Sequence, residues 1–160
     1  MNLLIEKVDN YLITWLHKWG DEFGRVSLFI IFFWFGILKL YNLSPAGPLV
    51  ESLMQVTVLS NIPAQQFLIF FGAFEAITGV LILIPKLERV TFILLFLHLC
   101  TTVMPLFLLP EVTWVIPGVA ATLTGQYIIK NLALLSVGLF LYARITPIAK
   151  TKHFLAVEEN

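Results

Sequence analysis

Eight apolar side chains follow one another early in the chain, in the run Leu28-Phe29-Ile30-Ile31-Phe32-Phe33-Trp34-Phe35. The surrounding segment, residues 26–40, contains one charged side chain, Lys39. A helix of about 20 mostly apolar residues crosses a hydrocarbon core that is roughly 30 Å thick. The segment therefore predicts a membrane-spanning helix that begins near Val26 and ends near Leu40.

Three further segments have the same apolar character, namely residues 64–84, 90–109 and 126–145. A proline closely follows each of them, and proline disrupts a helix because it has no backbone N–H to donate. No stretch alternates apolar and polar residues with a period of two, so a transmembrane barrel is not expected. The sequence predicts an all-α integral membrane protein, a bundle of four transmembrane helices in one domain, residues 1–160.

The overall composition agrees with a location in lipid. Of the 160 residues, 59% are hydrophobic and 12% are charged, whereas soluble domains have about 45–50% apolar and about 25% charged residues. Ten Lys and Arg balance ten Asp and Glu, so we expect no binding of nucleic acid, which needs a basic surface. The single cysteine, Cys100, excludes a disulfide framework and a Cys-rich metal site, and no metal is expected.

The positions of Lys and Arg predict the orientation in the membrane. Basic residues lie before the first span, between the second and third, and after the fourth: Lys7, Lys18, Arg25, Lys86, Arg89, Arg144, Lys150 and Lys152. The other two connections, residues 41–63 and 110–125, contain no Lys or Arg. Both termini are therefore expected on the cytoplasmic side.

Two further helices are expected outside the spans. In residues 1–24, apolar side chains recur at helical spacing opposite polar ones: Leu4, Val8, Leu12, Trp15 and Trp19. Such an amphipathic helix lies at the cytoplasmic interface with its tryptophans at headgroup level, or it packs on a partner protein. A short external helix is expected between spans one and two, at residues 49–56, after the breaks at Pro45 and Pro48.

Four ionisable side chains lie within the predicted spans: Lys39, Glu75, His98 and Lys130. Ionisable side chains in membrane helices are costly, and they are candidates for function. At a rise of 1.5 Å per residue, Glu75 and His98 fall near the midplane and the two lysines lie closer to the outside. Gly72, Ala76 and Gly79 share a helix face with Glu75. Since small residues allow close helix approach in lipid, Glu75 should point into the bundle.

Other polar residues extend this pattern on the third and fourth spans. Thr102 lies one turn after His98, and Asn131 follows Lys130. We therefore expect each of the four helices to carry a row of polar residues on one face, and these rows to meet along the central axis of the bundle. In the candidate site, Glu75 is the proton carrier, and Lys39 and Lys130 donate hydrogen bonds to ligand oxygens. Further contacts to the ligand are expected from four residues: His98, Asn131, Thr102 and Gln126.

Each of these residues also has a purely structural interpretation. The two lysines lie near helix ends, from which their side chains can extend to the interface. Glu75 can serve as an internal partner that pins the helices together, and His98 as a hydrogen-bonded core residue. A haem with two histidine ligands is not expected, because His17 and His153 lie in the cytoplasmic flanks.

Three short motifs occur in order along the predicted spans: FGILKL followed by GPLV (residues 35–40 and 47–50), GAFEAITGVLI (72–82) and GQYIIKNL (125–132). They resemble the patterns G-x-x-K-F…G-I-x-P-L, G-x-x-E-x-x-x-G-x-L and G-R-F-L-L-K-D-L of YkgB-like proteins, which belong to the DoxX-like group of small four-helix membrane proteins. The resemblance covers about residues 28–140. The chain departs from the patterns at Gln126 and Asn131, where an arginine and an aspartate are usual, and it lacks the acidic pair after the first-helix lysine.

The resemblance implies a subunit of the bacterial inner membrane that is associated with quinone-linked redox chemistry or with oxidative-stress defence. It matches Lys39, Glu75 and Lys130 residue by residue. No covalently bound cofactor is expected, and a quinone is the candidate ligand. A partner protein would have to supply electrons, because the chain has no electron-transfer motif of its own.

Three functions remain open at this point, and whether the protein is an enzyme is open with them. The first is the quinone-associated redox subunit. The second is a non-enzymatic structural or accessory subunit of a larger membrane complex, which the small size and the amphipathic N-terminal helix would suit. The third is a small transporter of an anion or weak acid, which ranks last because the chain has no inverted repeat. The expected partners are the lipid bilayer, a membrane or peripheral protein, and a second copy of the chain.

Overall fold

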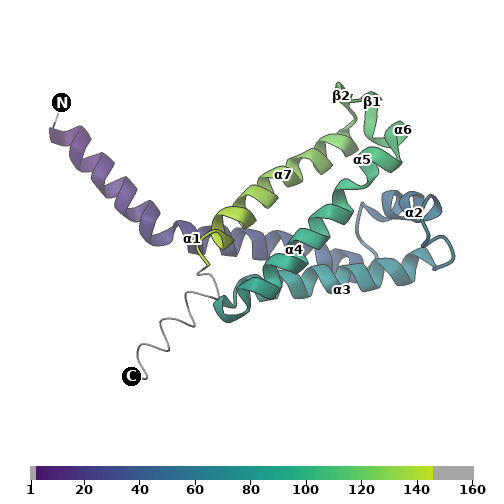
Figure 1. The fold of residues 1–160 in the computed structure, drawn as a ribbon, viewed down its shortest axis with the longest axis horizontal. Helices are drawn as coiled ribbons and strands as arrows, with labels where there is room; N and C mark the ends of the chain where they lie inside the picture. Colours follow the sequence, from purple (N-terminus) through teal and green to yellow (C-terminus); the bar gives the residue numbers. More distant parts are fainter. Residues whose placement is uncertain (1–2, 146–160) are drawn as a thin grey trace, which may run out of the picture.

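The computed structural model describes residues 3–145, which form a mostly helical molecule built around four long helices (Figure 1). The elements, in chain order, are α1 (Leu3–Leu40), α2 (Gly47–Gln55), α3 (Ala64–Ile82), η1 (Pro85–Leu87), α4 (Glu88–Val103), α5 (Pro105–Leu108), α6 (Pro110–Thr113), β1 (Trp114–Ile116), β2 (Ala120–Ala121) and α7 (Leu123–Tyr142). Four helical segments of this described part are long and apolar enough to cross a membrane: Leu3–Leu40, Ala64–Ile82, Pro85–Leu108 and Leu123–Tyr142. The expectation of a mostly helical, multi-pass membrane protein is thereby confirmed.

The helix boundaries follow from local chemistry. Pro63 precedes the first residue of α3, and the third span continues from α4 into α5 across Pro105, which begins the new helix. At the start of α7, the side chain of Thr122 accepts a hydrogen bond from the backbone N of Gly125 at 3.2 Å. Because this cap satisfies one of the free N–H groups of the first turn, α7 begins three residues earlier than the expected Gln126.

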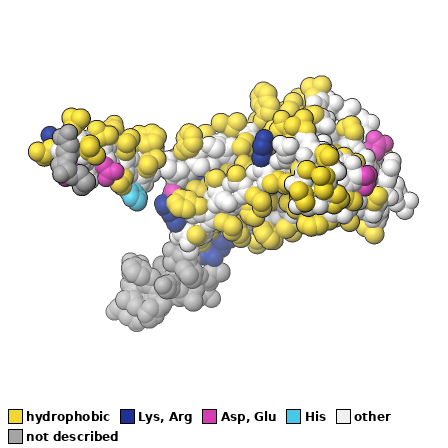
Figure 2. All heavy atoms as spheres, turned by 90° about the horizontal axis from the view of Figure 1, so that it is seen from above, with side chains coloured by type: hydrophobic (Ala, Val, Ile, Leu, Met, Phe, Trp, Pro, Cys, Tyr) yellow, Lys and Arg dark blue, Asp and Glu magenta, His cyan; other side chains and the backbone are white. Residues whose placement is uncertain are grey.

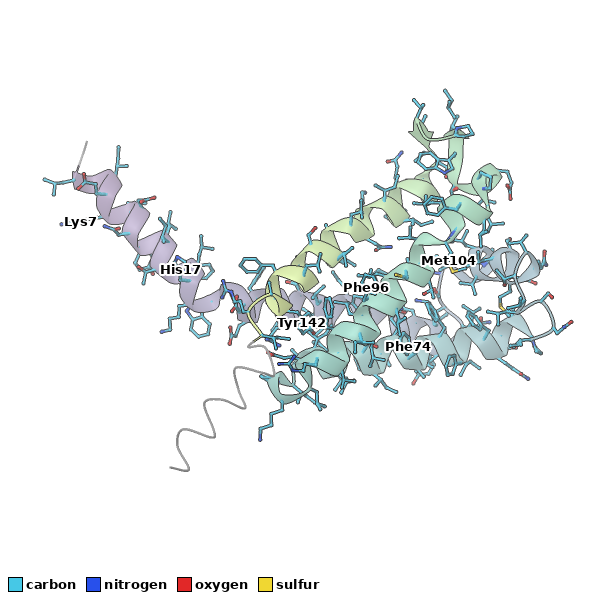
Figure 3. All side chains as sticks on the ribbon, in the orientation of Figure 1. Lys7, His17, Phe74, Phe96, Met104 and Tyr142 are labelled. Atoms are coloured by element: carbon cyan, nitrogen blue, oxygen red, sulfur yellow. The ribbon has the colours of Figure 1, made fainter. Side chains whose placement is uncertain are left out.

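The N-terminal amphipathic helix is not a separate element, contrary to the expectation. Residues 3–40 form one continuous helix of 38 residues. No proline interrupts this stretch, and glycines such as Gly20 and Gly24 cost a helix only about 1 kcal/mol each, so the helix runs through them. Its N-terminal part nevertheless leaves the bundle at an angle, with the change of direction close to His17 (Figures 1 and 3).

The short helix between spans one and two is present as α2, with Pro48 in its first turn. Proline is tolerated there because the N–H groups of the first turn have no hydrogen-bond partner within the helix.

The connection before α7 contains two short strands, which the expectation of an all-α protein did not include. There β1 and β2 form a small antiparallel hairpin in which Trp114 pairs with Ala121. Its turn has a backbone φ of 73° at Gly118 and a hydrogen bond from Val119 N to Ile116 O of 3.0 Å. Proline followed by glycine at the two central positions favours this turn.

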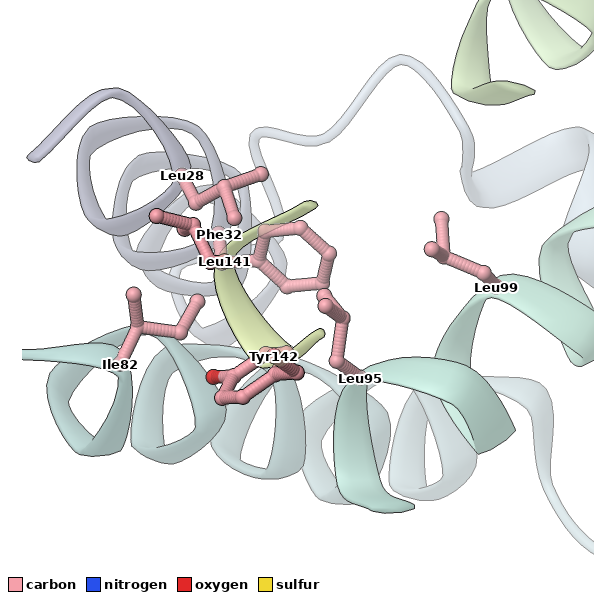
Figure 4. Close-up of a cluster of buried hydrophobic side chains, with 7 residues drawn as sticks. All are labelled: Leu28, Phe32, Ile82, Leu95, Leu99, Leu141 and Tyr142. Carbon is pink, nitrogen blue, oxygen red and sulfur yellow. The ribbon is translucent and has the colours of Figure 1, made fainter. Parts of the chain in front are cut away.

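The four long helices meet in a core at the end of the bundle where α3 and α7 terminate. Its buried members come from all four helices, as the close-up in Figure 4 shows: Leu28, Phe32, Ile82, Leu95, Leu99, Leu141 and Tyr142. Elsewhere, apolar side chains cover most of the visible surface (Figure 2). An apolar exterior is expected for a helix bundle in a membrane, because exposing apolar side chains to lipid chains has no hydrophobic cost.

Two ion pairs lie at this same end of the bundle. Arg25 of α1 pairs with Glu88 at the start of α4, and it also donates to the Ile82 carbonyl oxygen at 3.2 Å. Further along, Arg144 pairs with Asp21 at 2.5 Å. These pairs join α1 to the ends of its neighbours, so they mark where the bundle stops and the N-terminal part of α1 continues alone.

Candidate functional site

Glycines hold α1 and α3 in direct backbone contact along the part of the bundle that carries the site. A Cβ atom placed on Gly36 would lie 2.5 Å from the backbone N of Ala76, and one on Gly72 would lie 2.7 Å from the Cβ of Lys39. At Gly79 the nearest atom would be the backbone N of Phe33, at 2.8 Å. Since real Cβ atoms do not approach so closely, only glycine fits at these three positions, and the close approach brings Lys39 opposite Glu75.

Lys39 and Glu75 form a buried ion pair between these two helices. The Lys39 Nζ contacts Oε2 of Glu75, and the two residues are only 8% and 5% exposed. The same Nζ lies 3.5 Å from the backbone oxygen of Phe35 and 5.8 Å from the centre of the Phe71 ring. An isolated charge in such surroundings would be very unfavourable, and a directly contacting opposite charge offsets part of that penalty.

His98 of α4 joins the pair from the other side of the carboxylate. Its Nε2 lies 3.3 Å from Oε1 of Glu75, and the residue is 5% exposed. The imidazole stacks on the Phe71 ring at a centroid distance of 5.0 Å, and the Phe32 ring meets it edge-on at 4.9 Å. A third ring, that of Phe74 (labelled in Figure 3), lies 6.2 Å away. Three aromatic rings therefore fix the orientation of the imidazole.

One nitrogen of this imidazole has nothing to bond to. His98 Nδ1 is buried and makes no hydrogen bond within the described part of the chain. The nearby hydroxyls of Thr101 and Thr102 donate to the backbone oxygen of His98, at 2.7 Å and 2.9 Å, and not to its ring. A buried polar atom without a hydrogen-bond partner costs about 1–3 kcal/mol of stability. Among the side chains of Lys39, Glu75 and His98, this nitrogen is the one such atom.

The structure brings together three of the candidate residues, Lys39, Glu75 and His98, which we call the KEH cluster. Thr102 lies one turn further along α4, where its hydroxyl bonds to the helix backbone. The other three candidates belong to α7 and are not part of the KEH cluster: Gln126, Lys130 and Asn131.

The expectation that all four helices contribute to one polar axis is therefore wrong for α7. Lys130 is exposed, with its Nζ 5.0 Å from the centre of the Tyr127 ring. The inward face of α7 carries Gly125 and Ile128. Because successive helix residues are about 100° apart, Lys130, two positions after Ile128, points almost the opposite way.

Gln126 is also exposed, and its side-chain nitrogen donates to the backbone oxygen of Ala121 at 3.3 Å. Asn131 is half-buried. The Gln126 side chain thus lies at the start of α7, beside the hairpin that precedes it, and Asn131 lies near the middle of the helix.

Sequence reasoning missed the aromatic surroundings of the cluster. The phenylalanines of the first span have no part in the site that the sequence predicts, yet Phe32 is buried against His98. A usable signal was present, because Phe32 lies four residues before Gly36 and therefore on the same helix face. Arg25 was likewise interpreted only as a marker of orientation, whereas it is paired with Glu88.

The chemistry available in the KEH cluster is that of a carboxylate shared by two nitrogen groups in a dry environment. One oxygen of Glu75 contacts Lys39 and the other faces His98. A proton can therefore pass between Glu75 and the imidazole over 3.3 Å without any large movement. The donor set does not suit a metal, and within residues 3–145 no group of three or more His, Cys, Asp or Glu side chains is arranged to hold one.

Two surface grooves lie away from this cluster. One is lined by Ile13, Leu16, His17, Gly20, Asp21, Phe140 and Arg144, and the other by Leu4, Ile5, Val8, Asp9 and Leu12. Both involve the N-terminal part of α1.

Comparison with known proteins adds no assignment. No protein-family model matches the sequence, and neither a curated protein nor a solved structure is significantly similar to it. The function must consequently be argued from the geometry of the KEH cluster and from the sequence motifs.

Proposed function

We propose that the protein is a DoxX-like membrane subunit in which the KEH cluster binds the head group of a quinone and exchanges a proton with it. The observation that carries this proposal is the buried Nδ1 of His98, which has no hydrogen-bond partner among residues 3–145. A quinone carbonyl oxygen accepts hydrogen bonds, so it is a suitable partner for a protonated Nδ1. Aromatic rings around the imidazole, such as Phe71 at 5.0 Å, suit the flat ring of such a ligand.

The roles within the cluster differ from those expected at first. Lys39 is paired with Glu75, so its role in this proposal is to position that carboxylate, and the proposal gives no role to Lys130, whose Nζ lies over the Tyr127 ring. Glu75 faces Nε2 of His98, so the carboxylate can balance the charge of an imidazolium, which gives its Nδ1 proton to the ligand oxygen and remains as a neutral imidazole with Nε2–H toward Glu75. A bound quinone supplies the redox chemistry, while a partner protein supplies the electrons.

The test is to purify the protein in a mild detergent and to measure co-purified quinone by extraction and mass spectrometry. We expect a quinone in the wild-type protein and in Lys130→Gln, which alters a lysine outside the cluster, and a large loss in His98→Leu. A monodisperse His98→Leu protein that retains as much quinone as the wild type would overturn the proposal. So would a wild-type protein that carries none and binds none when a short-chain quinone is added.

A second function is favoured by one specific observation, the completeness of the Lys39–Glu75 pair between helices that touch at Gly36 and Gly72. In this alternative the pair only sets the register of α1 against α3, and the protein is an accessory subunit of a larger membrane complex. Purification at endogenous expression distinguishes the two. Stable protein partners without quinone, together with unaltered assembly in His98→Leu, support the accessory role, whereas quinone that is lost in His98→Leu supports the first proposal.

A further inference from the structure

The first helix is much longer than a membrane requires. Its 38 residues span about 57 Å at 1.5 Å per residue, whereas about 20 residues cross the hydrocarbon core. Counting 20 residues back from Leu40 reaches Asp21, the residue that pairs with Arg144 at the end of the bundle. Residues 3–20, which we call the arm, therefore continue beyond the bundle, as Figure 1 shows for the N-terminal part of α1.

One uninterrupted line of large apolar side chains follows α1 from the arm into the bundle. Its members recur with spacings of four, four and three residues, and all of them are exposed: Leu4, Val8, Leu12, Trp15, Trp19, Phe23, Val26, Ile30 and Trp34. Eleven residues in three turns is 3.67 residues per turn, close to the helical period of 3.6. The line, which we call the apolar stripe, therefore stays on one face of the helix over its whole length.

The second part of the apolar stripe lies where lipid is expected. Val26, Ile30 and Trp34 belong to the spanning part of α1, and they are exposed while Leu28 and Phe32 on the opposite side are buried in the core. In a bilayer the first group must contact lipid chains. Leu4, Val8 and the other arm members of the stripe continue the same face beyond the span, and all of them are exposed.

We propose that the arm is a lipid-binding element that lies on the bilayer surface with the apolar stripe in the acyl-chain boundary. Continuity of the stripe is the main argument. Inside the membrane, the apolar stripe faces lipid, away from the bundle. If the helix bends away from the bundle where it leaves the membrane, the stripe lies on the inner side of the bend and faces the bilayer surface. The arm then meets the same leaflet with the same face.

Two further features agree with this arrangement. Trp15 and Trp19 are the stripe residues nearest to the bundle within the arm, and tryptophan is favoured at the headgroup level. Gly20 is a point at which the helix can bend, because glycine is less favourable than alanine in a helix interior by about 0.5–1 kcal/mol. The Asp21–Arg144 pair does not prevent such a turn, since its side chains are 32% and 50% exposed and exposed pairs contribute only about 0–1 kcal/mol.

The charges of the arm indicate which kind of lipid surface it needs. Residues 3–20 contain two acidic side chains, Glu6 and Asp9, and two basic ones, Lys7 and Lys18, so their formal charges cancel. Amphipathic helices that select anionic membranes carry an excess of Lys and Arg on the polar face. The arm lacks this excess, so burial of apolar surface must drive its binding, and the binding should depend little on anionic lipid or on salt.

The experiment uses the full-length protein in vesicles, with Cys100→Ser as background and one spin label at a time. Leu12→Cys places the label on the apolar stripe, and Asn10→Cys, two residues away, places it on the opposite side as a matched control. Both positions are exposed, so neither label should disturb folding. Collision rates with oxygen, which concentrates in lipid, and with a water-soluble nickel chelate are measured in phosphatidylcholine vesicles with and without added phosphatidylglycerol.

We expect the label at residue 12 to collide mainly with oxygen and the label at residue 10 mainly with the nickel chelate. Both results should be unchanged by phosphatidylglycerol or by added salt. Equal access of the nickel chelate to both labels would overturn the proposal. Protection at residue 12 accompanied by dipolar broadening between labels, which disappears on dilution with unlabelled protein, would overturn it in favour of a second copy of the chain as the occupant.

Discussion

At the scale of single residues, the KEH cluster shows how a membrane interior changes the role of a charge. Glu75 has one oxygen toward Lys39 and the other toward His98, and all three residues are nearly inaccessible. Each charge is tolerable only because the other is present, so the effect of a substitution depends on whether its partner remains. This dependence can be measured.

Removing one partner of the buried pair should destabilise the protein far more than removing both. We expect Lys39→Met or Glu75→Leu alone to lower the free energy of unfolding by about 3–5 kcal/mol, because each leaves a buried ionisable group without its oppositely charged partner, while the double variant approaches the wild type. Arg144→Ala, which breaks the exposed pair with Asp21, should cost only about 0–1 kcal/mol. Equilibrium unfolding in detergent measures all four proteins. Additive effects of the two single substitutions would contradict the paired role.

The residues of this cluster were predictable as a type, but their grouping was not. Ionisable side chains inside apolar spans were visible in the sequence, and Glu75 was expected to face inward from its small neighbours Gly72 and Ala76. Lys130 looked equally suitable, and only the rotational setting of α7 shows that it faces outward. A helix of mostly apolar residues carries little information about its rotation, because lipid and protein interior are both apolar.

At the scale of elements, the α1–α3 pair is the part of the fold that positions the site. Three glycines allow the two backbones to touch, and this contact determines that Lys39 lies opposite Glu75. The α4–α7 pair, in contrast, meets through larger side chains: a Cβ on Gly138 would encounter only the tip of Leu95. Side-chain tips can move aside, whereas backbones cannot, so the two helix pairs should respond differently to added volume.

Gly36→Ala should destabilise the protein by about 1–3 kcal/mol, as is usual when volume is added to a packed interior. The new Cβ would lie 2.5 Å from the backbone N of Ala76, so α1 and α3 would have to separate. The matched control is Gly20→Ala in the same helix, where a Cβ meets nothing. It should stabilise α1 by about 0.5–1 kcal/mol, because alanine favours the helix.

Thermal unfolding and the quinone content of the purified protein give the two readings for these glycine variants. A Gly36→Ala protein as stable as the wild type would show that α1 and α3 do not touch as described. A Gly20→Ala protein that is destabilised would show that this position is packed against something in the membrane.

At the scale of the whole molecule, the four spans converge at one end, where the apolar core and the Arg25–Glu88 pair lie. Lys86 belongs to the same end, and the charge pattern predicts that this end faces the cytoplasm. The connection before α3 lies at the other end and carries no Lys or Arg from Tyr41 to Pro63. Orientation is therefore a property of the whole chain that labelling can test.

In a Cys100→Ser background, Ser60→Cys should react with a membrane-impermeant thiol reagent in intact cells. Lys86→Cys should react only after the membrane has been permeabilised. Both side chains are exposed, so access to the reagent depends on the side of the membrane and not on packing. The opposite labelling pattern would show that the excess of Lys and Arg at one end does not set the orientation of this protein.

The sequence by itself determined the number of spans, their approximate limits and the identity of the buried ionisable residues. These properties follow from apolar length and from the cost of charge in lipid, both of which act locally along the chain. The sequence could not determine that residues 3–40 form one helix. The amphipathic segment and the spanning segment have the same helical period, but their different compositions suggested two separate elements. The tertiary structure decided the rotation of each helix and thus the membership of the KEH cluster. The reason is physical: in a chain so uniformly apolar, close contact at a few glycines selects one helix face over another, and such contact exists only after the helices have packed.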